Sequence, residues 1–363
     1  MARGLAVAVV NGAPHPAGEV QGTDLVRRIV LDASPAVGEG FQSSPVRLRG
    51  ELEERKGLAA RSLGFYLEFL DDALRGILPH DLVLIGAETG AGKTELATNI
   101  ARSNAQAGKA VYFFALEAEP REIERRTKFA LLVELALKDG NPGAATLNYP
   151  DWLMGACEDV CGRYNDNADR VVAERFSTLH TFYRSTFGHD DIRREFTAIR
   201  DRADLIVLDH VHYVDVDDEN EQRGFKQTVK LIRSIALEMG RPVVLVAHLR
   251  KRDRRAAQVV PASDDFMGSS DLVKICTQVV QLAPAHCVEA AKWYLAPTFV
   301  HVPKDRRGGA TGLVALCNFD LRYRCYAPGY TLGRVVKGGT EWQPLPIARV
   351  PRWAKHHRPL EGP

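Results

Sequence analysis

The stretch from Leu82 to Ile100 constrains the fold of this chain more than any other. Apolar residues 82–85 precede the glycine-bearing sequence GAETGAGKT at 86–94, and a segment with helical character follows. A strand, a glycine-bearing turn and a helix in this order are the context that a phosphate-binding loop requires. Gly90 and Gly92 let backbone amides turn toward an anion, and the helix N-terminus adds free N–H groups. The alternative, a glycine-rich hairpin with a solvated lysine, leaves these flanks unexplained.

The side chains that end this loop predict a nucleoside triphosphate and a magnesium ion as ligands. Lys93 is placed to reach the β and γ phosphates, and the Thr94 hydroxyl to ligate Mg²⁺. One residue departs from the usual motif, because Ala87 stands where the first glycine is expected; Gly86 beside it would take up part of the turn. The sequence therefore predicts an ATP site that includes Ala87, Glu88, Thr89, Gly90, Ala91, Gly92, Lys93 and Thr94.

Composition and charge are those of an ordinary globular protein. The 363 residues are 45% hydrophobic and 26% charged, and the formal net charge is +2. With so small a net charge, any contact with nucleic acid must come from local basic clusters. No apolar run approaches the roughly 20 residues that cross a bilayer. We therefore expect a cytoplasmic protein without membrane contact.

The six cysteines lack a paired C-x-x-C spacing. We expect them to be reduced and to pack in the interior. Zinc binding by Cys157 and Cys161 is the weaker alternative.

Three regions differ in character. Residues 1–60 are rich in Gly, Pro, Ser and Ala and predict an arm with one short helix from Thr23 to Leu31. Residues 61–335 contain the phosphate loop and predict an α/β domain. From about Gly338 the chain is Pro-rich and basic, with Arg349, Arg352, Lys355 and Arg358, which predicts a loose tail over 336–363.

Within the central region, apolar runs alternate with helical periodicity. Runs at 82–85, 110–116, 205–209 and 242–247 predict buried strands. Helical segments are predicted at 122–137, 152–164, 190–202 and 225–239, and further strands at 279–282, 300–302 and 313–319. This alternation predicts a mostly parallel central sheet flanked by helices.

Polar residues stand where three of the predicted strands end. Ligands of such sheets gather at the carboxyl ends of the strands. Asp209 follows four apolar residues and is expected to hold the magnesium ion together with Thr94. Glu117 is a candidate base for the attacking water, although carboxylates often follow strands on a surface. His248 either senses the γ phosphate or merely ends a strand.

Two basic groups follow along the chain. Residues 250–255 (RKRDRR) come directly after His248; they form either a solvated loop or a contact with phosphates of a nucleic acid. The absence of aromatic residues there favours a sequence-neutral contact by Arg250, Lys251, Arg252, Arg254 and Arg255. Lys304 and Arg306, spaced by one on a predicted strand, would point the same way. They form either a basic surface hairpin or a cationic pair that faces a neighbour's nucleotide.

The ordered set of motifs resembles the RecA-fold ATPase domain of DnaB-type replicative helicases, including plasmid RepA-type hexameric helicases. The resemblance covers residues 61–326 and begins at Leu63-Gly64-Phe65. Residues 114–117 (FALE) resemble the motif whose glutamate is the catalytic base. Asp209 matches the Walker B aspartate, with His210 where tyrosine is usual, and His248 matches the γ-phosphate sensor, which is Gln in DnaB-type and His in RepA-type members.

The resemblance also implies a partner subunit and a DNA substrate. Residues 304–312 (KDRRGGATG) resemble the motif that supplies a lysine and an arginine finger to the adjacent subunit. In this family a homo-oligomeric, hexameric ring binds ATP between neighbours, and basic loops line a channel around single-stranded DNA. By this analogy the segment 250–265 is a channel loop, and the Thr23–Leu31 helix docks on an adjacent subunit.

These observations lead to an ATP-driven, ring-forming DNA helicase or translocase as the first hypothesis, with replication or recombination proteins as partners. A regulatory or recombination-type RecA-fold ATPase, in which ATP gates assembly without unwinding, is the second. A loader or defence component that uses the ring as a scaffold is the third.

Overall fold

The computed structural model describes residues 42–216, 221–249, 259–261, 271–308 and 311–359. The chain divides into two units, residues 1–60 and 61–363. In the first, α2 (Ser44–Arg47) precedes α3 (Glu51–Arg61). Acidic residues in the first turn of α3 and an Arg55–Glu51 ion pair of 2.9 Å favour a helix over the mixed-charge sequence 51–61. The predicted helix Thr23–Leu31 lies outside the described residues.

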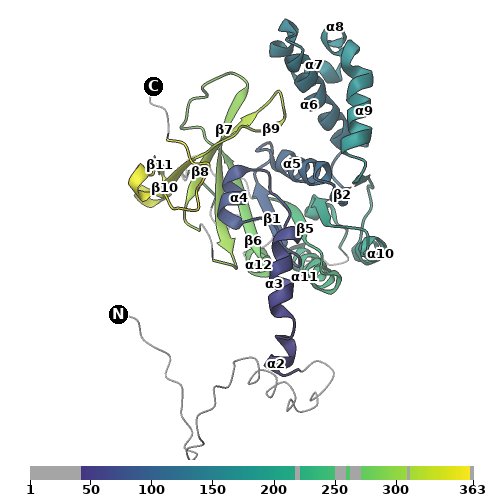
Figure 1. The fold of residues 1–363 in the computed structure, drawn as a ribbon, viewed down its shortest axis with the longest axis vertical. Helices are drawn as coiled ribbons and strands as arrows, with labels where there is room; N and C mark the ends of the chain where they lie inside the picture. Colours follow the sequence, from purple (N-terminus) through teal and green to yellow (C-terminus); the bar gives the residue numbers. More distant parts are fainter. Residues whose placement is uncertain (1–41, 217–220, 250–258, 262–270, 309–310, 360–363) are drawn as a thin grey trace, which may run out of the picture. The chain divides into compact units, whose positions relative to one another are not determined.

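The second unit is built on one eleven-stranded sheet (Figure 1). Its strand order is β11-β10-β8-β7-β6-β1-β5-β4-β2-β3, and β9 pairs with β8. The strands β1 to β6 form the parallel part: β1 (Leu82–Ala87), β2 (Val111–Ala115), β3 (Leu179–Phe182), β4 (Leu205–Asp209), β5 (Val243–His248) and β6 (Gln278–Pro284). The antiparallel part contains β7 (Leu295–Asp305), β8 (Val314–Asp320), β9 (Cys325–Tyr326), β10 (Thr331–Val336) and β11 (Glu341–Pro344).

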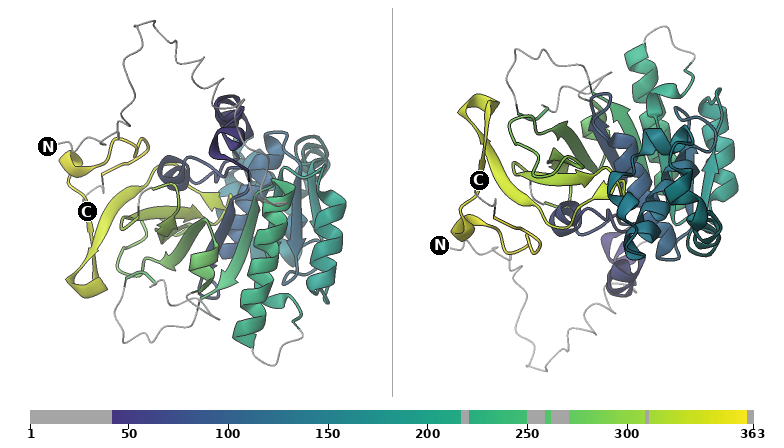
Figure 2. Two further views of the ribbon diagram at one scale, coloured as in Figure 1. Left: turned by 90° about the horizontal axis from the view of Figure 1, so that it is seen from below. Right: turned by 90° about the horizontal axis from the view of Figure 1, so that it is seen from above.

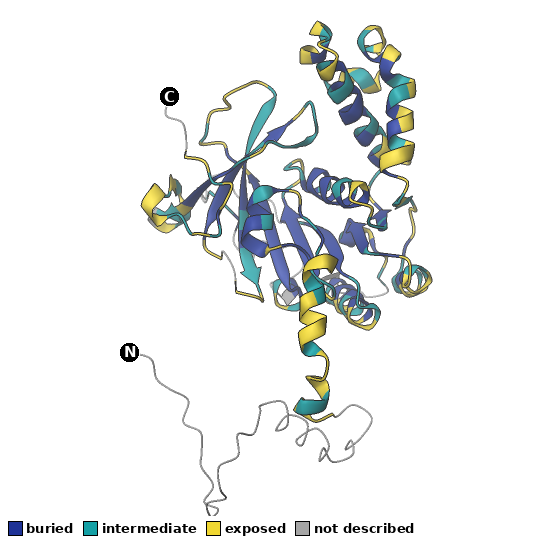
Figure 3. Ribbon diagram, in the orientation of Figure 1, coloured by how far each residue is buried: buried dark blue, intermediate teal, exposed yellow. Residues whose placement is uncertain are grey.

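Helices cover both faces of the parallel strands, as the alternation of strands and helices predicts. Successive strand residues point to opposite faces, so Val83 and Ile85 belong to one hydrophobic core and Leu82 and Leu84 to the other. The first core is closed by α4 (Glu68–Leu74), α5 (Lys93–Gln106), α6 (Glu122–Lys138) and α9 (Asn165–Arg175). The second is closed by α10 (His189–Ile199), α11 (Glu221–Met239) and α12 (Asp271–Ile275). Figure 2 shows this layering from two further directions, and Figure 3 shows the buried strands between half-exposed helices.

The region between β2 and β3 differs from the prediction. The expected helix 152–164 is broken into α7 (Tyr149–Leu153), α8 (Glu158–Cys161) and the 3-10 turn Gly162–Tyr164. Gly155 has a left-handed backbone, φ 78°, which interrupts a continuous helix. The helix α9 and the edge strand β3 were not predicted. All six cysteines are free, and Cys157 and Cys161 belong to no metal-ligand cluster of the described residues.

The expectation of a loose tail is wrong for residues 338–359. Strand β11 pairs with β10, and Trp353 packs against the first core beside Phe69, with ring centroids 6.4 Å apart. A basic, Pro-rich composition does not reveal such contacts, because they depend on residues far away in the sequence. Among the helices of the described ranges, none is long and apolar enough to cross a membrane.

Candidate active site

Strand register brings the residues that end β1, β2, β4 and β5 to one end of the parallel sheet. Ala87, the last residue of β1, pairs with His248, the last residue of β5. Ala115, the last residue of β2, pairs with Asp209 at the end of β4. The Leu116 amide then donates to the Asp209 carbonyl at 2.7 Å, so that Glu117 leaves its strand beside the aspartate.

The loop after β1 has the backbone that its glycines allow. Gly90 and Gly92 have φ of 81° and 85°, values that L side chains rarely adopt. Gly92 is the N-cap of α5, whose first turn directs its amides toward the loop. The alanine at position 87 is explained by its place in β1. Its backbone is extended, a conformation that does not require a glycine. Gly86 also lies within β1, so the expectation that it takes up part of the turn is wrong.

A cavity of about 640 Å³ opens above this loop. Residues 89–94 line it on one side, and Glu117 and Asp209 line it on another. Lys93 is 6% exposed; burial lowers its pKa, whereas the charges of Glu117 and Asp209 oppose this shift. The cavity thus places an ammonium group and two carboxylates around one space.

Asp209 and Thr94 offer oxygen ligands for a divalent cation. Burial raises the pKa of Asp209 to about 7, and a hydrogen bond with the Thr94 side chain lowers it in part. The Asp209 Oδ1 atom is buried and has no hydrogen-bond partner among the residues that the structure describes. An unsatisfied carboxylate oxygen beside a hydroxyl, in a cavity bordered by a phosphate-type loop, fits Mg²⁺, which prefers oxygen ligands.

Two histidines stand beside Glu117. The His248 Nε2 atom lies 3.8 Å from the Glu117 Oε1 atom, and the rings of His210 and His248 lie 3.9 Å apart, centroid to centroid. Burial, followed by the charge of Lys93, lowers the pKa of His248, so this ring is neutral at pH 7. Burial also lowers the pKa of His210.

The hydrogen bonding of His210 decides what this group can do. Glu117, His210 and His248 each place one ligand-type atom within 4.8 Å of the others, which suggests a metal site. However, the His210 Nδ1 atom accepts the His212 amide at 3.3 Å, which places the proton of the neutral ring on Nε2. With its proton on Nε2, His210 does not offer that atom to a metal; the Nε2 atom is buried and has no hydrogen-bond partner among the residues that the structure describes.

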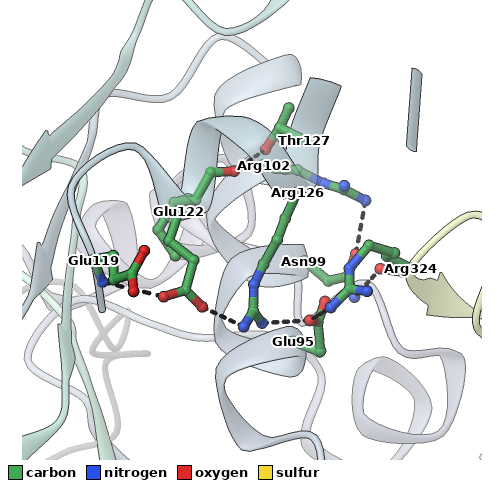
Figure 4. A network of polar contacts seen from close by, with 9 residues as sticks. Glu95, Asn99, Arg102, Glu119, Glu122, Arg126, Thr127 and Arg324 are labelled. Atoms are coloured by element: carbon green, nitrogen blue, oxygen red, sulfur yellow. Dashed lines mark hydrogen bonds and ion pairs between the residues drawn. The ribbon is translucent and has the colours of Figure 1, made fainter. Parts of the chain in front are cut away.

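One ionic network on the cavity wall was not predicted (Figure 4). Glu95, the residue after Thr94, forms ion pairs with both Arg126 of α6 and Arg324 of the β8–β9 turn. Arg126 also pairs with Glu122, and Arg324 stacks over Tyr149 at 4.5 Å. The position of Glu95 directly after the loop is the signal that could have identified it. The arginines carry no such signal: Arg126 lies 31 positions after Glu95 in the sequence, and Arg324 lies 229 positions after it.

The far wall of the cavity is mainly apolar. It comes from the ends of β6, β7, β8 and β9 and includes Pro284, Pro297, Phe319 and Tyr326. An apolar wall next to a charged loop is a surface on which a planar base can lie while its phosphates reach the loop.

Sequence comparison decides the family. The model of the DnaB-like helicase C-terminal domain matches residues 63–326, more than half of the chain. The chain belongs to this family. Within it, the replicative DNA helicase DnaB of Pasteurella multocida is 22% identical over 238 residues, which cover 62% of this chain and 47% of that protein. The chain thus spans about half the length of the curated relatives it matches.

Solved structures of a DnaB-like replicative helicase and of the G40P ATPase domain share the RecA-like fold of this chain. A DnaB-like replicative helicase, studied with its interactions with primase, has a TM-score of 0.63 at 16% identity and covers 84% of this chain and 70% of its own. The ATPase domain of the G40P protein has a TM-score of 0.60 at 17% identity and covers 78% of this chain and 96% of its own. The predicted α/β fold with a largely parallel sheet is therefore confirmed.

Two further residues predicted from the DnaB-like motifs lie far from this cavity. Register places Lys304 of β7 opposite Val279 of β6, near the amino end of β1. The Lys304 Nζ atom donates to the Lys274 carbonyl at 2.9 Å, and the Arg306 Nη2 atom donates to the same carbonyl at 3.2 Å. Because both cations donate to one carbonyl, they lie on the same side, as their spacing predicts, at the end of the strands opposite the loop.

The last predicted group, Arg250, Lys251, Arg252, Arg254 and Arg255, lies outside the described residues.

Proposed function

We propose that this DnaB-like chain is an ATP-hydrolysing DNA helicase or translocase that forms a homo-oligomeric, hexameric ring around single-stranded DNA. The motor domain begins at residue 61 and includes strand β11 and the residues after it that pack on the first core. One observation carries the proposal: Lys93, Thr94, Glu117 and Asp209 border a single cavity next to a loop with the backbone of a phosphate-binding site.

Each of these residues has a role that its place supports. Lys93 binds the β and γ phosphates, because it is the buried cation of the loop. Thr94 and Asp209 hold Mg²⁺, which supplies charge neutralisation to the phosphates when bound. Glu117 orients and deprotonates the attacking water, and His248 beside it senses the γ phosphate. The apolar wall from Pro284 to Tyr326 receives the base.

A second subunit completes the site. Lys304 and Arg306 lie at the end of the sheet opposite the loop, so within one chain they do not border the cavity. They bind backbone carbonyls of α12, and Lys304 is half-buried and Arg306 exposed, so that a neighbour in a ring can approach them. We therefore assign them to the nucleotide of the adjacent subunit, where a cation stabilises transition-state charge.

The DNA contact is assigned to the basic residues 250–255, because they follow the strand that ends at His248. Because these residues follow His248, which we place beside the γ phosphate, ATP turnover and DNA binding would be linked through this strand. Replication or recombination proteins are the proposed partners, by analogy with a DnaB-like helicase studied with primase.

ATP turnover measured with and without single-stranded DNA tests the proposal. We expect turnover to rise severalfold with single-stranded DNA, and Lys93→Ala to abolish it. Lys128→Ala, which removes a lysine of α6 paired with Asp169, should leave turnover unchanged. Hydrolysis that ignores DNA would favour an ATPase that gates assembly instead. Hydrolysis that persists in Lys93→Ala would contradict the assignment of the site.

A further inference from the structure

Residues 345–359 form a strap along the side of the motor domain. Within this strap, only basic and neutral residues occur, and no acidic residue lies between Glu341 and Glu361. The proposed ATPase site and its proposed DNA loop leave this segment without a role.

The strap is fixed to the domain by contacts along its length. The Leu345 amide donates to the Leu332 carbonyl at 2.8 Å, and the Arg358 amide donates to the Tyr330 carbonyl at 2.8 Å. Near its end, the His356 amide donates at 3.0 Å to the buried carboxylate of Asp72 in α4, which also accepts the Tyr330 hydroxyl at 2.7 Å. These contacts hold the backbone of the strap in one place.

Side chains of the strap divide into an inner and an outer set. Val350, Trp353 and Ala354 face the hydrophobic core. The outer set contains the four cations, which recur at every third residue and are all exposed: Arg349, Arg352, Lys355 and Arg358. None of the four forms an ion pair or a side-chain hydrogen bond within the described part of the chain.

We propose that this strap binds the phosphate backbone of the nucleic acid on which the motor acts, as a contact separate from residues 250–255. The inference rests on the proposed function for its partner. Three residues span at most about 10 Å of chain, so successive cations are separated by no more than that length of a backbone that is fixed to the domain. Exposed cations at such short intervals suit a linear polyanion, and the cost of ordering the chain is already met by its contacts with the domain. An acidic membrane surface is a poorer match, because Ile347 is the one large apolar side chain exposed among the strap residues described.

Binding of the full-length protein to a fluorescent single-stranded oligonucleotide, measured over a series of salt concentrations, tests this inference. The variant replaces all four cations by Gln. We expect Kd at low salt to rise at least about tenfold, and the slope of log K against log salt to shrink by about 3, since each phosphate contact on a single strand contributes about 0.7. ATP turnover without DNA should not change.

Two control variants separate charge from structure. The charge-conserving set Arg349→Lys, Arg352→Lys, Lys355→Arg and Arg358→Lys should bind as the wild type does. Neutralising the exposed Arg170, Arg175, Arg193 and Arg200 changes the net charge equally and should leave the slope nearly unchanged. Binding by the wild type with an unaltered slope in the strap variant would overturn the inference alone. No binding of DNA by the wild type would overturn the proposed function as well. Strap-dependent binding to vesicles containing phosphatidylserine, without an effect on DNA, would also contradict it.

Discussion

His248 at the end of β5 lies 3.8 Å, Nε2 to Oε1, from Glu117 beyond the end of β2. The two residues are separated by 131 positions in sequence and by strand β4 in the sheet. Glu117, the candidate base, lines the cavity, and His248 is the last residue of the strand that leads into residues 250–255. The first two predictions test this pair.

Replacing Glu117 by Gln removes the base and keeps the size of the side chain. We expect kcat for ATP hydrolysis to fall by about 10² to 10⁴, the usual contribution of general base catalysis, while nucleotide affinity is retained. Glu119→Gln is the matched control, since the Glu119 side chain is 83% exposed and does not line the cavity. Equal turnover in the two variants would contradict the role of Glu117.

His248 is tested by one conservative and one disruptive change. His248→Gln retains a hydrogen-bonding side chain, and we expect it to preserve stimulation of the ATPase by single-stranded DNA. His248→Ala removes that side chain and should abolish the stimulation, with less effect on turnover in the absence of DNA. Steady-state turnover with and without an oligonucleotide measures both. Full stimulation in His248→Ala would show that His248 is only a strand-end residue.

Glu95 stabilises two arginines at once. Its side chain is 9% exposed and pairs with both Arg126 and Arg324, so Glu95→Gln leaves Arg324 without its counter-charge and Arg126 with Glu122 alone. We expect a loss of about 3 to 5 kcal/mol in the free energy of unfolding, measured with urea. Glu134→Gln removes an exposed pair with Lys138 and should cost less than about 1 kcal/mol. Similar losses in the two variants would contradict the importance of the network.

Asp71 gives the stability a definite dependence on pH. Burial raises its pKa to about 6, although its carboxylate accepts the Phe65 amide at 2.7 Å. The folded state therefore holds a proton that the unfolded state loses near pH 4, so this group lowers the free energy of unfolding as the pH rises from about 4 to about 6. The loss amounts to at most about 3 kcal/mol.

Asp71→Asn keeps the hydrogen-bond acceptor and cannot ionise. We expect its free energy of unfolding, relative to the wild type, to increase between pH 4 and pH 7. Urea titrations at several pH values give this difference free of the other titrating groups. A relative stability that decreases with pH would show that the carboxylate is favoured by its surroundings.

Local sequence patterns were sufficient for the centre of the fold. Strands β1, β2, β4 and β5 are short apolar runs with a polar residue at or just beyond the end, and a parallel sheet necessarily brings those ends together. The positions of Glu117, Asp209 and His248 therefore follow from where each strand stops. The conformations of Gly90 and Gly92 follow from their lack of a Cβ atom.

Other features depend on partners that no local pattern contains. Arg324 meets Glu95 only because β8 and β9 fold back over the cavity. The strap is ordered because Asp72, near the start of the domain, accepts hydrogen bonds from His356 near the end. The hydrogen bond from the His212 amide to His210, which fixes the proton on the ring, requires the turn after β4.

The central claim is that one ATP site is shared between two subunits, and a mixing experiment tests it most directly. Lys93→Ala and Arg306→Ala should each be nearly inactive alone, the second by about a thousandfold or more if Arg306 acts as an arginine finger. In an equal mixture, about one interface in four joins an intact loop to an intact Arg306, as a head-to-tail ring requires. We predict recovery of about a quarter of the wild-type ATP turnover. A mixture that is no more active than its two components would contradict the shared site.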